Sequence, residues 1–434
     1  MRDQHPCDED IQDSLVDGDR PFTPGARAAL RHRVFRIVFT GAFLSNVGTW
    51  MQNAVLAGYA YTLTHSKTFV GLLTAAQLAP LLLLSLFGGY IADLVDRRRL
   101  IIWVSIEQLA FSIVLALIVR SPDPSRLAIF LAVLAIGIGQ AVYAPAYSAV
   151  LPALVGSEDL AGAISLNSAQ MNGSRVIGPP VGGILLHLFG PSWVFAGNAV
   201  TYLFVIGSLM MVRFPAQAVL KAGTRGLRQL LVGVRVARRD KVVGRSLITI
   251  FLFSGFALAF IGQLASVVED NLGIKASSAG YGLIYGTFGV GAMIGALSIG
   301  TVFVSWSKPL LVRIGMAGYA VTLTVFALLR SAPLAYPVIL VLGFFYFGMV
   351  TSLSTVLQER LDDSVRGRVM ALWVMGFGGT VGFANIFLGR LMDATSVTAV
   401  LLANAAVAAG LFLYADLRVP DDAGDLVVMA ALAD

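Results

Sequence analysis

Long apolar segments separated by short polar ones constrain the fold more than any other feature of the sequence. A helix that crosses a bilayer needs about 20 mostly apolar residues. We predict twelve such spans, at residues 36–63, 70–94, 100–120, 126–150, 161–188, 192–212, 246–268, 279–303, 310–330, 334–357, 367–391 and 396–416. Charged residues make up only 13% of the chain, against about 25% in soluble domains. The sequence therefore predicts an all-α integral membrane protein with twelve transmembrane helices.

The positive charges fall mainly between the apolar segments. If both termini are cytoplasmic, twenty-four of the 31 Lys and Arg residues lie on the cytoplasmic side, six lie outside, and Arg175 lies within a span. Because cytoplasmic loops collect Lys and Arg, this distribution favours cytoplasmic termini and insertion in the inner or plasma membrane. The formal charge of +6 is then a topology signal, and we expect no nucleic-acid partner.

One long basic connection divides the predicted spans into two sets of six. Residues 150–166 align weakly with residues 356–372, which suggests an internal repeat and two bundles related as parallel repeats. The predicted organisation is a disordered cytoplasmic tail at 1–33, a first six-helix bundle at 34–212, a basic cytoplasmic linker with an amphipathic helix at 213–245, a second six-helix bundle at 246–417, and a cytoplasmic tail at 418–434.

The loop after the second span combines small, acidic and basic residues. Gly89 removes a side chain where the helix can press against another backbone. Asp93 places a carboxylate at the carboxyl end of a helix, where the helix dipole disfavours it. We therefore expect Asp93 to contact an arginine or the amino terminus of another helix. Arg97 and Arg98 follow Asp93 in the sequence. The alternative to a functional loop is that these arginines serve only as topology anchors.

The internal repeat suggests a partner for Asp93. The eleventh span begins near Asp363, and its first turn contains Arg366 and Arg368. We therefore expect these residues to meet the loop after the second span, at a contact between the two bundles.

The fifth span contains a dense group of glycines and prolines, Gly178, Pro179, Pro180, Gly182 and Gly183. Prolines inside a helix remove backbone donors and bend it, and glycines admit close packing. This chemistry suits a helix at a moving interface. The alternative is that glycine and proline are simply frequent in membrane helices.

Two ionisable residues lie inside predicted spans, where charge is costly and usually functional. Glu107 lies about 12 Å from the cytoplasmic face at the rise of an α-helix, and it is our candidate for a proton-coupling carboxylate or a structural partner. Arg175 lies deep in the fifth span. It either holds an anionic substrate group or ties helices together, and the sequence favours the second role. Glu269 and Asp270 follow the seventh span and are expected to face external water.

Two of these motifs resemble motifs of the major facilitator superfamily. Residues 89–98 resemble its signature loop, although Leu94 replaces a basic residue and Asp96 replaces a glycine. Residues 178–183 resemble the Gly-Pro-x-x-Gly-Gly core of its antiporter motif, with Ser165 and Ser174 at positions that the full motif gives to glycine. Further similarity covers residues 46–52, 143–146, 195–199 and 366–370, within a resemblance that spans 45–400. The chain resembles the branch that contains the enterobactin exporter and related multidrug and macrolide efflux proteins.

This resemblance implies two six-helix, pseudo-symmetric bundles that rock about a central site. It also implies that the loop at Asp93 locks the cytoplasmic side when the cavity faces outward, and that helices 1, 4, 7 and 10 line the cavity. Polar and aromatic residues of those helices are our candidates for the substrate cavity: Asn46, Trp50, Asn53, Gln140, Tyr143, Tyr147, Gln263 and Tyr346. Each of them alone is also compatible with ordinary helix packing.

The resulting functional hypothesis is a monomeric, proton-coupled exporter of an amphipathic small organic molecule, such as a drug or a siderophore-like compound. The nearest alternative is an uptake permease or a lysophospholipid flippase of the same fold. A membrane-embedded enzyme and a sensor are less compatible with the sequence, which lacks a catalytic motif and an output domain. One Cys and four scattered His predict no metal site, and we expect no cofactor, with the proton gradient as energy source.

Overall fold

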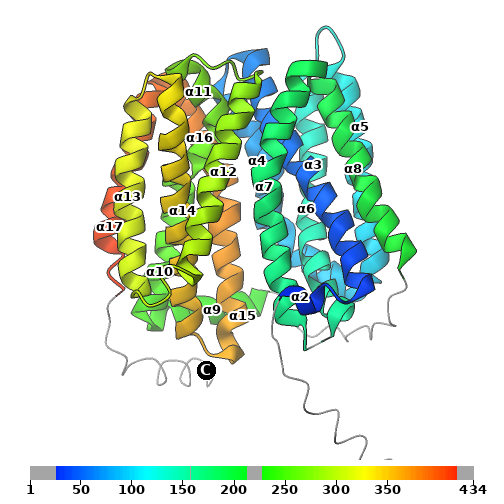
Figure 1. The fold of residues 1–434 in the computed structure, drawn as a ribbon, viewed down its shortest axis with the longest axis vertical. Helices are drawn as coiled ribbons and strands as arrows, with labels where there is room; N and C mark the ends of the chain where they lie inside the picture. Colours follow the sequence, from blue (N-terminus) through cyan, green and yellow to red (C-terminus); the bar gives the residue numbers. More distant parts are fainter. Residues whose placement is uncertain (1–25, 157, 213–226, 418–434) are drawn as a thin grey trace, which may run out of the picture.

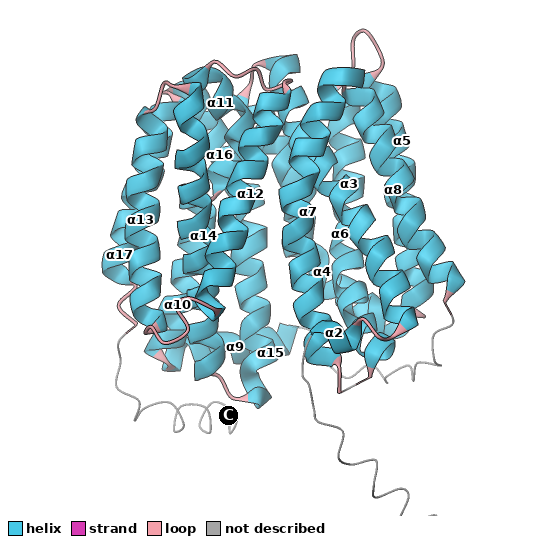
Figure 2. Cartoon of the chain, in the orientation of Figure 1, coloured by secondary structure: helices cyan, strands magenta, loops and turns pink. Residues whose placement is uncertain are grey.

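The computed structural model describes residues 26–156, 158–212 and 227–417, and all regular secondary structure in these residues is helical (Figures 1 and 2). The predicted tails at 1–25 and 418–434, and the linker segment 213–226, lie outside the described residues. Within the segment predicted as a tail, Ala26–Ala29 form the short helix α2, which packs against α7. Ala29 is fully buried there, so the ordered structure begins earlier than we predicted.

Each predicted span corresponds to one helical rod. The first half consists of α3 (Arg33–Thr64), α4 (Lys67–Leu94), α5 (Arg97–Val119), α6 (Arg126–Val155), α7 (Leu160–Phe189) and α8 (Pro191–Met211). The second half contains α12 (Ala279–Gly300), α13 (Lys308–Leu328), α14 (Ala332–Arg360) and α17 (Val397–Tyr414), together with two interrupted rods.

The interrupted rods are the seventh and the eleventh. The seventh runs through α10 (Lys241–Leu252), the π-helical turn η2 (Phe253–Ala257), the 3₁₀ turn η3 (Ala259–Gln263) and α11 (Leu264–Leu272). The eleventh runs through α15 (Asp363–Val374), the π-helical turn η4 (Met375–Gly379) and α16 (Thr380–Ala394). Such turns often mark functional positions in a helix. Both interruptions occur where glycines gather in the sequence.

Ten rods of the described chain are long and apolar enough to cross a membrane. The helices α3 and α7 are not among them, because they carry more amide, hydroxyl and charged side chains. These two helices pack against each other, and α7 also packs against α12 of the second half. Neighbouring protein can therefore shield polar side chains that lipid would not tolerate.

The two halves meet along two helix pairs, α4 with α16 and α7 with α12. Small residues bring these backbones together. A β-carbon on Gly183 would lie 3.0 Å from the Cα atom of Gly282. A β-carbon on Gly71 would lie 2.2 Å from the carbonyl oxygen of Asn385. Neither position has room for a side chain, so these glycines set the distance between the halves.

The two ends of the molecule differ in their secondary structure. At one end, here called the α9 end, lie α2, α15 and the linker helix α9 (Leu227–Arg239) (Figure 1). At the other end, here called the α11 end, lies α11 (Figure 1). Helix α9 occupies the region where we predicted an amphipathic helix, and it packs against α15 and α10 of the second half.

Candidate functional site

A cavity of about 190 Å³ lies between the two halves. The first half contributes residues of α3, α4 and α7, and the second half contributes residues of η3, α12, α14, η4 and α16. The lining residues are Trp50, Asn53, Leu56, Ala57, Val70, Leu73, Thr74, Gln77, Leu78, Arg175, Leu258, Ile261, Gly262, Tyr285, Phe288, Tyr346, Phe377, Gly378 and Val381. Because both halves form its walls, relative motion of the halves would change its shape and access.

The polar groups of this lining are few and lie mainly in the first half. The side-chain amide of Gln77 donates a hydrogen bond to Asn53 Oδ1 at 3.2 Å, so α3 and α4 are joined at the cavity wall. Thr74 lies one turn before Gln77 on α4. Among the described residues of the lining, Arg175 on α7 is the one Asp, Glu, Lys or Arg residue.

The second half contributes an aromatic wall centred on Tyr346. Its ring stacks on Phe288 with centroids 5.6 Å apart, and on Phe253 at 6.0 Å. Tyr319 donates a hydrogen bond to the carbonyl oxygen of Ala257, which fixes this cluster against η2. An aromatic wall opposite amide groups suits a ligand that has an apolar body and a polar end.

Arg175 lies between aromatic rings of the two halves. Its guanidinium carbon is 4.5 Å from the Trp50 ring centroid on α3 and 5.2 Å from the Phe347 ring centroid on α14. Both distances are within the range of cation–π attraction. Its buried Nε atom has no hydrogen-bond partner.

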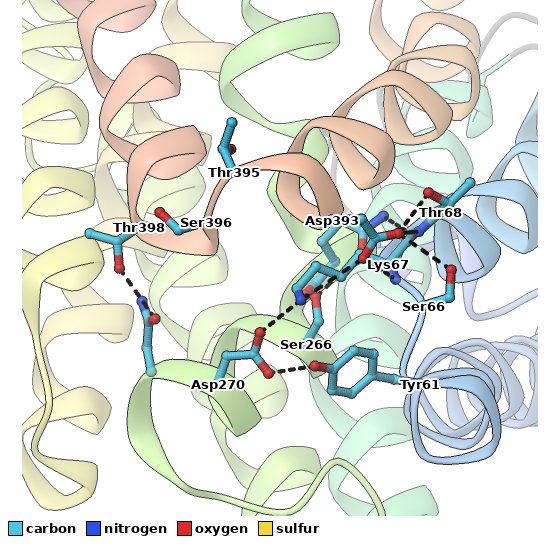
Figure 3. A network of polar contacts seen from close by, with 12 residues as sticks. Tyr61, Ser66, Lys67, Thr68, Ser266, Asp270, Asp393, Thr395, Ser396 and Thr398 are labelled. Carbon is cyan, nitrogen blue, oxygen red and sulfur yellow. Dashed lines mark hydrogen bonds and ion pairs between the residues drawn. The ribbon is translucent and has the colours of Figure 1, made fainter.

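At the α11 end, charged groups pair across the halves (Figure 3). The ammonium group of Lys67, at the start of α4, lies 3.0 Å from Asp270 of α11 and 3.9 Å from Asp393 of α16. The Tyr61 hydroxyl of α3 also donates a hydrogen bond to Asp270. Asp270, which we expected simply to face water, instead joins the second half to the first.

Asp393 also caps the amino terminus of α4. Its carboxylate accepts hydrogen bonds from the backbone N–H of Lys67 at 3.0 Å and of Thr68 at 2.9 Å, and from the Thr68 hydroxyl at 2.7 Å (Figure 3). A carboxylate is favourable at a helix amino terminus, where backbone donors are free and the dipole is positive. The last turn of the eleventh rod is therefore hydrogen-bonded to the first turn of the second rod.

The predicted cavity residues divide into two groups. Trp50, Asn53 and Tyr346 line the cavity, whereas Asn46, Gln140, Tyr143, Tyr147 and Gln263 are not among its lining residues.

The second group makes contacts elsewhere. Gln140 accepts a hydrogen bond from Gln108 at 3.1 Å, and Tyr143 stacks on Tyr147 with centroids 5.6 Å apart, all within the first half. Gln263 donates to the carbonyl oxygen of Lys67 at 3.0 Å, so it contributes to the contact between halves at the α11 end.

The predicted signature loop makes its described contacts within the first half. Arg97 donates to the carbonyl oxygen of Ala149 at 3.0 Å, and Arg98 donates to that of Leu209 at 2.8 Å, near the carboxyl end of α8. Asp96 accepts the backbone N–H of Arg99 at 2.9 Å and caps α5.

The expected contact between the signature loop and the eleventh rod lies partly outside the described residues. The surroundings of Gly89 and the side chains of Asp93 and Asp363 belong to the part of the chain that is not described. Arg366 donates to the carbonyl oxygen of Leu361 at 3.0 Å, and Arg368 follows on the same helix, α15.

The remaining motif glycines pack against α3 and α12. A β-carbon on Gly178 would lie 2.8 Å from the carbonyl oxygen of Val47, and one on Gly182 would lie 2.9 Å from that of Met51. Gly183 faces α12, as does the carbonyl oxygen of Pro179. This segment of α7 therefore packs on its own half and on the other half at once.

Glu107 lies inside the first half and does not line the cavity. Its Oε2 atom is buried without a hydrogen-bond partner, close to Gly139 of α6. Any effect of Glu107 on the cavity would have to pass through the helices of the first half.

The sequence did not indicate that α4, α12, η4 and α16 contribute to the cavity, and in η3 it pointed to Gln263 where Ile261 and Gly262 form the lining. The glycines around the two interruptions, including Gly262, Gly378 and Gly379, were an available signal, because clustered glycines weaken a helix locally. Thr74 and Gln77 were also visible as polar residues spaced i, i+3 in an apolar span.

The fold is shared with solved transporters. The chain superposes on the nucleoside transporter NupG with a TM-score of 0.73 at 12% identity, covering 88% of this chain and 98% of that one. It superposes on a bacterial homologue of the iron transporter ferroportin, in an inward-facing state, with a TM-score of 0.69 at 16% identity, covering 89% and 99%.

Among curated proteins, the chain is similar to the enterobactin exporter EntS. The forms from Escherichia coli O1:K1 and from Shigella boydii serotype 4 are each 29% identical to it over 349 residues, which covers 79% of this chain and 81% of the relative.

Two halves of six rods around a shared cavity, together with a family profile that matches nearly the whole chain, define a secondary transporter of the major facilitator superfamily. The profile of one family within it matches residues 24–432, nearly the whole chain. The protein therefore belongs to the family described as transmembrane secretion effectors.

Proposed function

We propose that this protein exports an amphipathic small organic molecule by alternating access, with inward proton movement as the energy source. The observation that carries the proposal is the cavity itself, which has an amide-lined wall from the first half and an aromatic wall from the second. Polar contacts between the halves lie at its α11 end. A cavity shared in this way opens when the halves tilt and the contacts at one end break.

The direction of transport rests on sequence similarity and charge. The family is described as secretion effectors, and a relative at 29% identity is an exporter. The distribution of Lys and Arg supports a cytoplasmic α9 end. In that orientation the contacts at the α11 end close the cavity toward the outside, and cargo enters from the cytoplasm.

The proposed residue for proton coupling is Glu107. Two features support Glu107 in this role: it lies inside a span, and its buried Oε2 atom has no hydrogen-bond partner. It lies away from the cavity lining, so coupling through Glu107 would require a change in the packing of α5 against α6. Asp93, Asp363, Arg366 and Arg368 remain candidates for the lock at the α9 end.

Everted membrane vesicles test direction and coupling together. Two matched probes are suitable, naphthalene-2-sulfonate and naphthalene-2-sulfonamide, which differ in charge and little in shape. With an acidic lumen, vesicles that contain the protein should accumulate at least one probe, and nigericin should abolish the accumulation. Accumulation only in right-side-out vesicles would overturn export.

Glu107→Gln should lose the gradient-driven accumulation while still binding the probe. Full gradient-driven transport by that variant would show that Glu107 is not the coupling residue.

A further inference from the structure

Arg175 carries a charge that the described protein does not neutralise. It lies in the middle of α7 and lines the cavity between the halves. No carboxylate of a described residue lies within ion-pair distance of it, and its Nε atom is buried without a hydrogen-bond partner. An unpaired cation in the middle of a membrane protein is costly, and such residues mark substrate or ion sites.

Aromatic contacts compensate only part of this cost. The guanidinium lies over the Trp50 ring from one side and near the Phe347 ring from the other. These rings orient the cation but supply no negative charge and no hydrogen-bond acceptor for its N–H groups. Trp50 belongs to the first half and Phe347 to the second, so Arg175 is positioned where the halves converge.

Other cations in the described chain show the contrast. Lys67 has two carboxylates within 4 Å, Asp270 and Asp393. Arg313 resembles Arg175 more closely, because its guanidinium lies 4.9 Å from the Phe412 ring and its Nε atom also lacks a partner. Arg313, however, lies in the second turn of α13 and outside the cavity, where a long side chain can reach the membrane surface. Arg175 combines an unpaired charge with a place in the cavity wall.

We propose that Arg175 binds an anionic group of the cargo, and that the cargo class is therefore an aromatic or amphipathic organic anion. A planar guanidinium matches a carboxylate or sulfonate through paired hydrogen bonds. The apolar body of such a cargo would lie against the wall formed by Tyr285, Phe288 and Tyr346. This assignment rests on the proposed transport function and narrows it, since a neutral or cationic cargo would leave the arginine unpaired.

Equilibrium binding in lipid nanodiscs separates charge recognition from transport. Isothermal titration should show naphthalene-2-sulfonate binding at least about tenfold more tightly than naphthalene-2-sulfonamide to the protein, as a buried charge-assisted pair implies. Arg175→Gln should reduce this preference to less than about twofold, and Arg175→Lys should retain part of it, because the charge remains without the planar fork. Arg313→Gln is the matched control, and it should keep the full preference.

Several results would overturn the assignment. They are equal binding of the two probes, no binding of either probe, or a preference that survives Arg175→Gln in protein with an unchanged thermal transition. Other results would overturn the proposed export function. If the sulfonate binds selectively but neither probe accumulates in everted vesicles, export is wrong and anion recognition stands. If the sulfonamide accumulates and binds as tightly as the sulfonate, export stands and anion recognition is wrong.

Discussion

At the α11 end, charged side chains pair across the two halves, whereas the contacts described for Arg98 and Arg360 at the α9 end each lie within one half. Lys67 and Asp393 connect the second rod to the eleventh. By contrast, Arg98 binds the end of α8 in the first half, and Arg360 pairs with Asp240 at 3.0 Å in the second half. The first arrangement must break when that end opens, while the second can persist through the motion. These two sets of described contacts therefore differ in whether motion of the halves must break them.

The largest effect should come from filling the close contact between the halves near the α11 end. Gly71→Leu would push a side chain into the backbone at Asn385, and overpacking of this kind costs about 1–3 kcal/mol. The closed state should become inaccessible, so vesicle transport should fall by more than about tenfold while membrane insertion persists. Gly410→Leu is the control, because nothing lies within 4 Å of a β-carbon there. Normal transport by Gly71→Leu would show that this contact is not needed for the cycle.

The next effect should come from the carboxylate that caps α4. Asp393→Ala removes the carboxylate that accepts the hydrogen bonds from Lys67 and Thr68. Loss of a helix cap costs about 0.5–2 kcal/mol. Hydrogen exchange at the amides of Lys67 and Thr68 should therefore become severalfold faster, as measured by mass spectrometry.

A matched control is available at the same end. Ser396 caps α17 by accepting the N–H of Ala399 at 3.1 Å, within the second half. Ser396→Ala should speed exchange in α17 and leave the start of α4 unchanged. Unchanged exchange at Lys67 and Thr68 in Asp393→Ala would indicate that the bond between the halves contributes little to closure.

A smaller effect is expected from the predicted lock at the α9 end. If Asp93 holds the eleventh rod only in the outward-facing state, Asp93→Asn should slow vesicle transport by about fivefold, equivalent to about 1 kcal/mol. The amount of protein in the membrane should not change. Asp123→Asn, in the loop between α5 and α6, is a control of equal charge. Wild-type turnover by Asp93→Asn would show that Asp93 does not lock the α9 end.

The smallest effect on transport should come from Arg98, whose described hydrogen bonds lie within the first half. Arg98→Ala removes hydrogen bonds to the carbonyl oxygens of Leu209 and Met210. The thermal transition should fall, by an amount that corresponds to about 1–2 kcal/mol. Transport per folded molecule should stay within about twofold of wild type. A large loss of transport without loss of stability would mean that this contact changes during the cycle.

Sequence alone predicted the twelve rods and their grouping, because hydropathy depends on local composition. It also placed Trp50 and Tyr346 at the cavity and singled out Arg175 as an intramembrane charge. It favoured a structural role for Arg175. That no carboxylate of a described residue lies within ion-pair distance of Arg175 is a property of the packed helices, which the sequence does not specify. The resemblance to the superfamily added the prediction of the fold and of a central site between the two bundles.

The missed features depend on how whole helices are rotated and tilted. Helix α6 was expected to line the cavity, but its Gln140 and Tyr143 contact residues of the first half. Gln77 of α4 reaches the cavity instead. Which face of an apolar helix meets the other half follows from close contacts such as that of Gly71, which no pattern along one helix specifies. The role of Asp393 likewise depends on its meeting a helix more than 300 residues away in sequence.

The cap that Asp393 places on α4 has a consequence for energy use. When the α11 end parts, water can solvate the released carboxylate and the freed amides, so the exchange of partners nearly balances. Breaking this contact therefore costs little free energy. Thermal motion can open it once cargo or a proton shifts the equilibrium between the two conformations. A closed contact made of apolar side chains would instead expose apolar surface to water in every transport cycle.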